Sequence, residues 1–189
     1  MSTEKIRLET PLTLEALKRL KSGDHVLISG VVYMARDAAH ARFHEAIHKG
    51  EEIPFDPQGQ VIYYSGPTQA KPGHVIGSCG PTTASRMDPY TVPLIERGLR
   101  GMIGKGVRSP EVLAAMKKHG CVYFGAIEGT AALISHKIQS AEVIAYHELG
   151  AEAVLRLQVF EMPVTVINDL HGGDLYVEGQ KQYRRQRGI

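Results

Sequence analysis

Cysteine is scarce in this sequence, which limits both its covalent chemistry and its capacity for metal clusters. Of 189 residues only two are cysteines, Cys79 and Cys121, and they do not form a CxxC pair. Iron–sulfur clusters typically take three or four cysteines, so this chain cannot hold such a cluster alone. A chain of this length buries roughly two thirds of the surface of its unfolded state, so it needs no disulfide to fold.

Long apolar runs and a large excess of one charge are also missing. No run approaches the roughly 18 residues of a membrane span. The first residues, MSTEKIRLETP, are charged where a signal peptide has an apolar core. The net charge of +2 is too small to indicate nucleic-acid binding, although the stretch KQYRRQRGI near the C-terminus is basic. We therefore expect a cytoplasmic protein with no membrane or nucleic-acid partner.

Nothing in the sequence divides the chain into separate units. It has no internal repeat, no low-complexity segment and no linker rich in proline, glycine or serine. Apolar residues make up 43% and charged residues 22%, as in ordinary globular proteins. We expect one domain over residues 1–189, with 1–7 and 181–189 as tails.

The apolar pattern predicts strands and helices that alternate in the second half of the chain. Strands are expected over residues 25–35, 60–66, 74–80, 102–106, 121–127, 141–147, 154–160 and 163–170. Helices are expected over residues 10–24, 36–50, 88–101, 109–120 and 130–138, with Thr13, Asp88 and Ser109 as caps. Alternation of strand and helix indicates an α/β fold, with a mixed sheet flanked by helices.

The segment GPTTASRMD, residues 80–88, is rich in groups that bind anions. Glycine lets the backbone approach a ligand closely, and the amides at a helix start attract negative charge. Arg86 adds a planar fork that fits a carboxylate. Thr82 and Thr83 add hydroxyls that donate or accept hydrogen bonds. The alternative interpretation is a helix cap followed by a surface arginine.

A second polar group lies in the segment ARDAAHARFH, just after a predicted strand. Arg36, Asp37 and His40 fall within one helical turn, and Arg36 and His40 share a face. His44 and His48 continue that row. Histidines at this spacing could bind a metal, but an ordinary solvated helix face is the alternative.

Two further residues have chemical potential. Lys105 lies between two glycines at the end of a short apolar strand, where α/β sheets usually bind ligands. Cys79 is either a nucleophile or, given its apolar surroundings, an inert buried thiol. Three cations, Arg36, Arg86 and Lys105, without an acidic metal cage suggest a small polyanion, most simply a dicarboxylate.

Several blocks in this order resemble a known family. They are ARDAAH, GQVIYYSGP, GPTTASRMDPY, GKG and HGCVYFGAIEGTAA, followed by YHELGAEAVLRLQVFEMPVTVINDLHGGDLY. The sequence is similar to the C-terminal domain of class I fumarases and to the β subunits of two-subunit fumarases and L(+)-tartrate dehydratases. The likeness runs from about residue 8 to the end of the chain.

The resemblance implies a fold, a partner and a reaction. It implies a swivelling β/β/α domain that works with an iron–sulfur α subunit, in a heteromer such as α2β2. Three cysteines of that partner would hold a 4Fe–4S cluster. The implied reaction is the reversible hydration of fumarate to L-malate. Alternatives are the β subunit of an L(+)-tartrate dehydratase and, in another class, a non-catalytic carboxylate-binding or assembly module.

The resemblance also assigns roles to residues. It implies that Arg36, Arg86 and Lys105 grip substrate carboxylates, and that Gly80 and Pro81 shape the turn, supported by Thr83. It implies that the Thr82 hydroxyl is the base that moves the carbon-bound proton. An ordinary alcohol is a poor base near neutral pH. Spacing alone nominates Asp37 and His40 instead, so both are retained as candidates for catalysis or proton relay.

Overall fold

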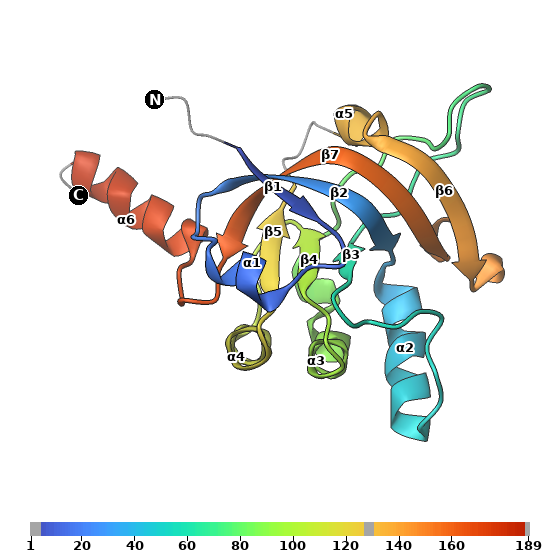
Figure 1. Ribbon diagram of the computed structural model, residues 1–189, viewed down its shortest axis with the longest axis horizontal. Coiled ribbons are helices and arrows are strands. Elements are labelled where there is room, and N and C mark those ends of the chain that lie inside the picture. Colours follow the sequence, from blue (N-terminus) through green and yellow to red (C-terminus); the bar gives the residue numbers. More distant parts are fainter. Residues whose placement is uncertain (1–4, 127–130, 188–189) are drawn as a thin grey trace.

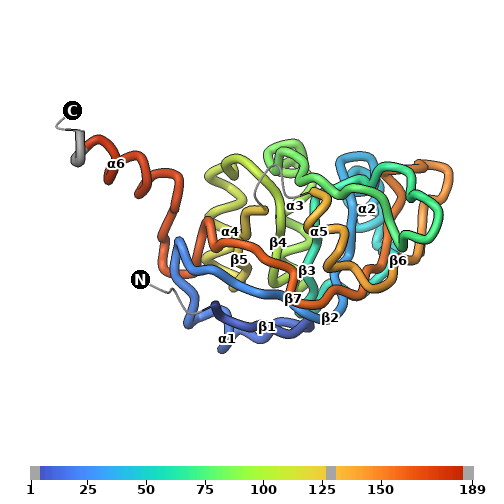
Figure 2. The backbone as a smooth tube through the Cα atoms, turned by 90° about the horizontal axis from the view of Figure 1, so that it is seen from above, coloured from blue at the N-terminus to red at the C-terminus, as the bar shows by residue number. Residues whose placement is uncertain are grey.

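The chain folds into three layers, two of strands and one of helices (Figures 1 and 2). The computed structural model describes residues 5–126 and 131–187. A curved upper layer contains β1 (Ile6–Glu9), β2 (His25–Met34), β6 (Ile138–Ala145) and β7 (Val154–Asn168). Beneath it lie β3 (Val61–Tyr63), β4 (Gly101–Gly104) and β5 (Val122–Gly125), and then α2 (Asp37–Lys49), α3 (Asp88–Glu96) and α4 (Pro110–His119). The predicted α/β class with a mixed sheet flanked by helices is confirmed.

The two strand layers belong to one sheet that folds back on itself. The described residues form seven strands in the order β1-β2-β3-β4-β5-β7-β6, with a further pairing between β2 and β7. Strands β2, β3, β4 and β5 pair in parallel, whereas β7 is antiparallel to both β2 and β5. The carboxyl ends of parallel strands lie at the same edge of the sheet, so the loops after β2, β3 and β4 all emerge at that edge.

The short strands β3 and β4 are buried on both faces, which explains their nearly continuous apolar sequence. Successive side chains of a strand point to opposite faces. Accordingly, Tyr63 and Ile103 pack into the core between the two strand layers. Ile62 and Met102 pack into a second core between the lower strands and the helices. The lower strands are therefore held from both sides, and their carboxyl ends form a fixed edge.

Two helices begin at the caps that the sequence predicts, although one of them ends at Lys18, well before the predicted residue 24. In α4, the Ser109 hydroxyl accepts a hydrogen bond from the Val112 amide at 3.3 Å, and Gly120 ends the helix in the left-handed conformation at φ 79°. In α1 (Leu14–Lys18), Thr13 accepts from the Ala16 amide. These local hydrogen bonds confirm both predicted caps.

The strand predicted over residues 74–80 is wrong. This segment is a loop that bonds to other loops, with the Thr68 amide donating to Ser78 and the Cys79 amide to Ala131. Both edges of the neighbouring β3 are already occupied, by β2 and β4. Ile76 and Cys79 nevertheless pack into the core between the strand layers. Their burial explains the apolar pattern without any strand pairing.

Other boundaries also differ from prediction. The strands predicted over 154–160 and 163–170 are the single strand β7, which continues through Glu161 in a left-handed conformation at φ 49°. Residues 6 and 7, predicted to be tail, begin β1, and residues 181–187, also predicted to be tail, continue α6 (Leu175–Arg187). Helix α6 projects away from the layers (Figure 2).

The short elements complete the chain: η1 (Ala84–Arg86), α5 (Ala131–Ser135) and η2 (His147–Glu152). Predictions for residues 127 and 130, at the ends of a predicted strand and helix, fall outside the described residues. No helix in the described ranges is both long enough and apolar enough to cross a membrane.

Candidate functional site

A polar hollow lies at the carboxyl ends of the parallel strands. Its volume is about 490 Å³. It is lined by residues from segments far apart in the chain: Arg36, Gly66, Thr68, Ser78, Gly80, Pro81, Thr82, Lys105 and Ala131. The fold therefore brings together Arg36, Gly80, Pro81, Thr82 and Lys105 of the residues predicted from the sequence.

Main-chain hydrogen bonds hold Thr82 beside Lys105. The Thr82 amide donates to the Tyr64 carbonyl at 2.6 Å, just beyond β3. The Lys105 amide donates to the Thr82 carbonyl at 3.2 Å, and the Ala84 amide donates to the Lys105 carbonyl at 2.8 Å. Residues 82–84 thus run alongside the end of β4 as an extra stretch of sheet. This pairing fixes the two side chains on neighbouring segments.

The turn at Gly80 and Pro81 is tied to the end of β3. The Ser65 hydroxyl donates to the Gly80 carbonyl at 2.8 Å, and Ser65 and Pro81 form an antiparallel bridge. The Tyr63 hydroxyl donates to the Cys79 carbonyl at 2.6 Å. Hydroxyl groups from the strand therefore satisfy the carbonyls of the turn and set its direction.

Arg36 reaches the hollow from the end of β2, and carboxylates lie beside it. Its Nη2 atom is 3.5 Å from Glu152 Oε1, and its Nε atom is 3.7 Å from Asp37 Oδ1. Arg36 Nε and Asp37 Oδ1 are buried and have no hydrogen-bond partner within the described part of the chain. A Cβ atom at Gly66 would lie 2.7 Å from the Ala151 carbonyl oxygen and 3.0 Å from Arg36 Cδ. Glycine at this position leaves the space that the guanidinium stem occupies.

Arg86 and Thr83 lie at the edge of the site and do not line the hollow. Arg86 Nη2 donates to Asp37 Oδ2 at 2.6 Å, and its side chain is half exposed. Asp37 therefore lies between Arg86 and Arg36. Thr83 is exposed and forms a parallel bridge with Lys105. Three predicted cations occupy one region, with Arg86 joined to the hollow through Asp37.

His40 is buried behind the site. Its Nδ1 atom donates to the Arg36 carbonyl at 2.8 Å, and its ring packs against those of Phe43 and Tyr64. Desolvation by burial lowers the pKa of His40 to about 4, so the ring is neutral near pH 7. His40 does not line the hollow, and it holds the main chain of Arg36. Its predicted part in catalysis stays a prediction.

The cysteines have the properties of inert buried thiols. Burial raises the pKa of Cys79 and of Cys121 to about 12. The Cys79 thiol donates weakly to the Gly77 carbonyl, with the sulfur 3.2 Å from the oxygen. Within residues 5–126 and 131–187, no group of three His, Cys, Asp or Glu side chains is placed to hold a metal ion.

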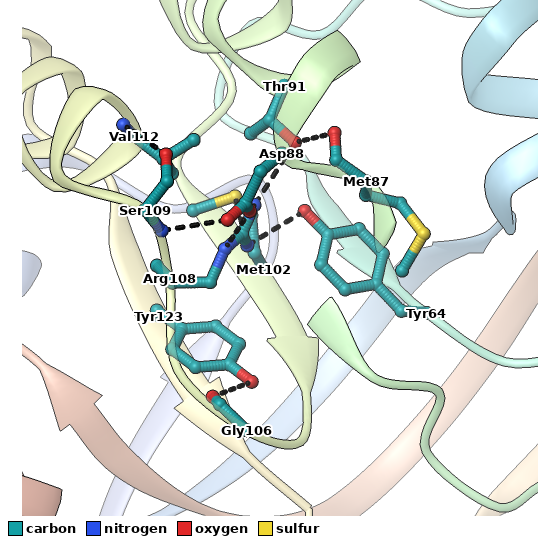
Figure 3. A network of polar contacts seen from close by, with 10 residues as sticks. All are labelled: Tyr64, Met87, Asp88, Thr91, Met102, Gly106, Arg108, Ser109, Val112 and Tyr123. Atoms are coloured by element: carbon teal, nitrogen blue, oxygen red, sulfur yellow. Dashed lines mark hydrogen bonds and ion pairs between the residues drawn. The ribbon is translucent and has the colours of Figure 1, made fainter. Parts of the chain in front are cut away.

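A buried arginine that was not predicted from the sequence lies in a network of polar contacts (Figure 3). Arg108 is only 5% exposed, and its Nε atom donates to Asp88 Oδ1 at 2.7 Å. Its other nitrogens donate to the hydroxyls of Tyr64 and Thr91, both at 3.1 Å. The predicted capping role of Asp88 is wrong: α3 begins at Asp88 itself, whose second oxygen accepts from the Ser109 amide at 2.7 Å.

The surroundings of Arg108 keep it charged. Desolvation by burial acts to lower the pKa of its guanidinium, but Tyr64 and Asp88 outweigh that effect, and the pKa is raised. Glu152, also missed, accepts from the Ala38 amide at 3.2 Å while it pairs with Arg36. No local sequence pattern marks either residue, because the oxygen and nitrogen partners named here lie 17 or more positions away.

These features define a class: a mixed α/β domain with a hollow lined by an arginine and a lysine at the carboxyl ends of its parallel strands. The chain belongs to the family described as Fumarase C-terminus, whose model matches residues 1–179. The resemblance to class I fumarases and to tartrate dehydratase β subunits is thereby confirmed.

Individual relatives fall into two groups by length. The chain is 38% identical over 177 residues to Fumarate hydratase 2 of Leishmania major, covering 91% of this chain and 31% of that protein. It is 37% identical to Fumarate hydratase class I, anaerobic, of Escherichia coli (strain K12), covering 91% and 32%. It is 36% identical to the Putative L(+)-tartrate dehydratase subunit beta of Methanocaldococcus jannaschii, covering 90% and 91%. The chain thus spans about a third of the fumarate hydratases and nearly all of the dehydratase subunit.

Proposed function

We propose that this chain is the β-type component of a hydro-lyase that reversibly hydrates fumarate to L-malate. Its part in that enzyme is to grip the substrate carboxylates and to supply the proton-transfer group. The observation that supports this most directly is the common hollow of Arg36, Thr82 and Lys105. Membership of the Fumarase C-terminus family supports a hydro-lyase reaction at this hollow.

The charges around the hollow suit a dicarboxylate. Lys105 and Arg36 bring two cations to one cavity, and a four-carbon diacid carries two negative charges. A guanidinium binds a carboxylate through paired hydrogen bonds, whereas an ammonium acts as a point charge. The nearby carboxylates of Asp37 and Glu152 lie at ion-pair distances from Arg36. We infer that Arg36 orients one carboxylate and Lys105 attracts the other, with Arg86 at the rim.

Thr82 is the proposed group for proton transfer at carbon. An alcohol is a poor base near neutral pH, so its alkoxide form needs nearby positive charge. Lys105 supplies such charge from the adjacent segment, and Arg36 lines the same cavity. Asp37 and His40 stay as candidates for a relay, but neither lines the hollow.

We further propose that the partner is an α subunit that carries a 4Fe–4S cluster, in a heteromer such as α2β2. A relative named as a beta subunit matches this chain along 91% of its own length, which supports a two-subunit enzyme. The buried thiols of Cys79 and Cys121 support placement of the cluster on the other subunit. When bound, the cluster supplies a Lewis acid; this chain supplies cations, a hydroxyl and the walls of the cavity.

L(+)-Tartrate is the second candidate substrate, favoured by the near full-length match to the dehydratase subunit. L(+)-Tartrate carries the same two carboxylates as L-malate and has one more hydroxyl. The cations of this chain alone therefore do not distinguish these two diacids. A third possibility, a non-catalytic carboxylate-binding or assembly module, predicts that Thr82 variants leave the activity of the assembled enzyme intact.

The test is anaerobic assembly of this chain with a cluster-bearing α subunit from the same source. Fumarate hydration should require both chains, and it should be lost when either is omitted. A panel of fumarate, L-malate and L(+)-tartrate identifies the preferred diacid by kcat/KM. Full activity of the purified chain alone, without iron, would refute the proposal.

A further inference from the structure

The guanidinium of Arg108 bonds to Asp88 (Figure 3) and so joins the segment that follows Thr82 to the loop that follows Lys105. It lies three residues after Lys105 and bonds to Asp88, six residues after Thr82. We propose that Arg108 is a positioning residue that sets the placement of the Thr82 hydroxyl relative to Lys105. This role in turnover rests on the proposed function, whereas the structural coupling does not.

Arg108 contacts residues on both sides of the Thr82 segment. Through Nη1 it holds the hydroxyl of Tyr64, whose carbonyl accepts the hydrogen bond from the Thr82 amide. Through Nε and Nη2 it holds Asp88 and Thr91 at the start of α3, directly after the segment. A single rigid group thus fixes residues 82–88 from both ends.

The Lys105 loop is held by the same cluster. Asp88 accepts from the Ser109 amide as well as from Arg108, so it grips two successive residues of the loop between β4 and α4. Between Lys105 and Arg108, the Gly106 carbonyl accepts from the Tyr123 hydroxyl at 3.1 Å. Movement of Arg108 would therefore shift the loop that carries Lys105.

A gain in stability alone does not explain the buried ion pair between Arg108 and Asp88. A buried ion pair costs desolvation energy, and well-packed apolar residues often replace one without loss of stability. What distinguishes the Arg108–Asp88 pair is its directed hydrogen bonding: the three guanidinium nitrogens bond to oxygen atoms of three different side chains. Directional contacts of this kind hold a reacting group in a fixed geometry.

The first test measures amide hydrogen exchange in an Arg108→Lys variant. Lysine keeps the positive charge beside Asp88 but cannot make three directed contacts. The amides of Thr82, Ala84 and Lys105 should exchange about tenfold faster than in the unchanged protein, because lost hydrogen bonds to a charged group loosen that segment. Amides of β2 that pair with β7 should change no more than in the control.

The control is Arg100→Lys. Arg100 precedes β4 at its opposite end and donates to the carbonyls of His119 and Gly120, away from the hollow. If Arg108→Lys does not fold, Tyr64→Phe decides the question, since it removes one contact of Arg108 and keeps the ring. That variant should speed exchange at the same three amides by about threefold.

The second test uses the assembled enzyme. Arg108→Lys should lower kcat by about tenfold and change KM by less than about threefold, because Arg36 is held by other segments and the long-range attraction of the Lys105 charge tolerates a small shift of its loop. Arg100→Lys should change neither by more than about twofold. Unchanged exchange at the three amides, or a loss confined to KM, would overturn the role of Arg108. Absence of any dehydratase activity, with exchange altered as expected, would refute the proposed function and leave the coupling in place.

Discussion

The arginines at the two ends of the parallel strands have different partners. At the amino end of β4, Arg100 donates to the main-chain carbonyls of His119 and Gly120, and so ties one loop to another. At the carboxyl end of β2, Arg36 lies beside two carboxylates and a polar cavity, and its buried Nε makes no hydrogen bond within the described part of the chain. The first arginine ties main-chain segments together, whereas the second is the one that we propose binds a substrate carboxylate.

The largest effect on activity is expected from removal of the Thr82 hydroxyl. Thr82→Val in the assembled enzyme should lower kcat by about 10³-fold, because general acid–base groups contribute on that order. KM should change little, since Arg36 and Lys105 remain. Steady-state kinetics measure both constants. Thr82→Ser, which keeps a hydroxyl, is the matched control; a Thr82→Val enzyme within tenfold of the original would remove Thr82 from proton transfer.

Truncating one arginine at each end gives the next largest effect. Arg36→Met should lower kcat/KM by about 10²-fold, since losing a charged partner of a bound carboxylate costs roughly 2–5 kcal/mol. Arg100→Met should lower the free energy of unfolding while kcat/KM of the folded protein stays the same. Kinetics combined with urea unfolding separate the two outcomes. Equal losses of kcat/KM in both variants would contradict the division between the two ends.

His40 should make the free energy of unfolding depend on pH. Its pKa is lowered from 6.5 to about 4 in the folded chain, so below pH 6.5 the unfolded chain binds a proton that the folded chain does not. Stability is therefore full above pH 6.5 and falls between pH 6.5 and 4. From about pH 7.5 to about pH 5 this contributes a loss of about 2 kcal/mol in the free energy of unfolding.

His40→Gln should lack that part of the pH dependence. Urea unfolding of the two proteins at both pH values provides the measurement. Parallel losses in the variant and the original protein would show that His40 is not the titrating group.

The smallest effect is expected at Cys79. Cys79→Ala should change kcat/KM by less than about twofold, because a thiol with a pKa near 12 is not a nucleophile at neutral pH. Thiol-labelling reagents should react slowly with the folded chain and rapidly after unfolding. Loss of activity in Cys79→Ala with normal stability would revive a thiol-based reaction.

Sequence predicts structure well here where the determining contacts are local. The ends of α4 depend on Ser109, which bonds three residues ahead, and on Gly120, which adopts a left-handed conformation. Both signals lie within the helix and its immediate flanks. The predicted Lys105 position at a strand end is likewise a local property of β4.

Predictions from local sequence were wrong where contacts between distant segments determine the structure. The apolar residues of 74–80 suggest a strand, but β2 and β4 already occupy both edges of β3. Arg108 has the sequence context of an exposed residue before a helix cap. Its burial depends on Asp88, Thr91 and Tyr64, which lie 17 to 44 positions away. Such partners cannot be assigned without the fold.

The most direct measurement is a crystal structure of the assembled enzyme with L-malate bound. The two carboxylates of malate should lie within hydrogen-bond distance of Arg36 and Lys105, with the Thr82 hydroxyl facing a carbon of the substrate. Malate bound elsewhere, with the hollow around Thr82 empty, would contradict the proposal that this chain supplies the cationic side of the active site.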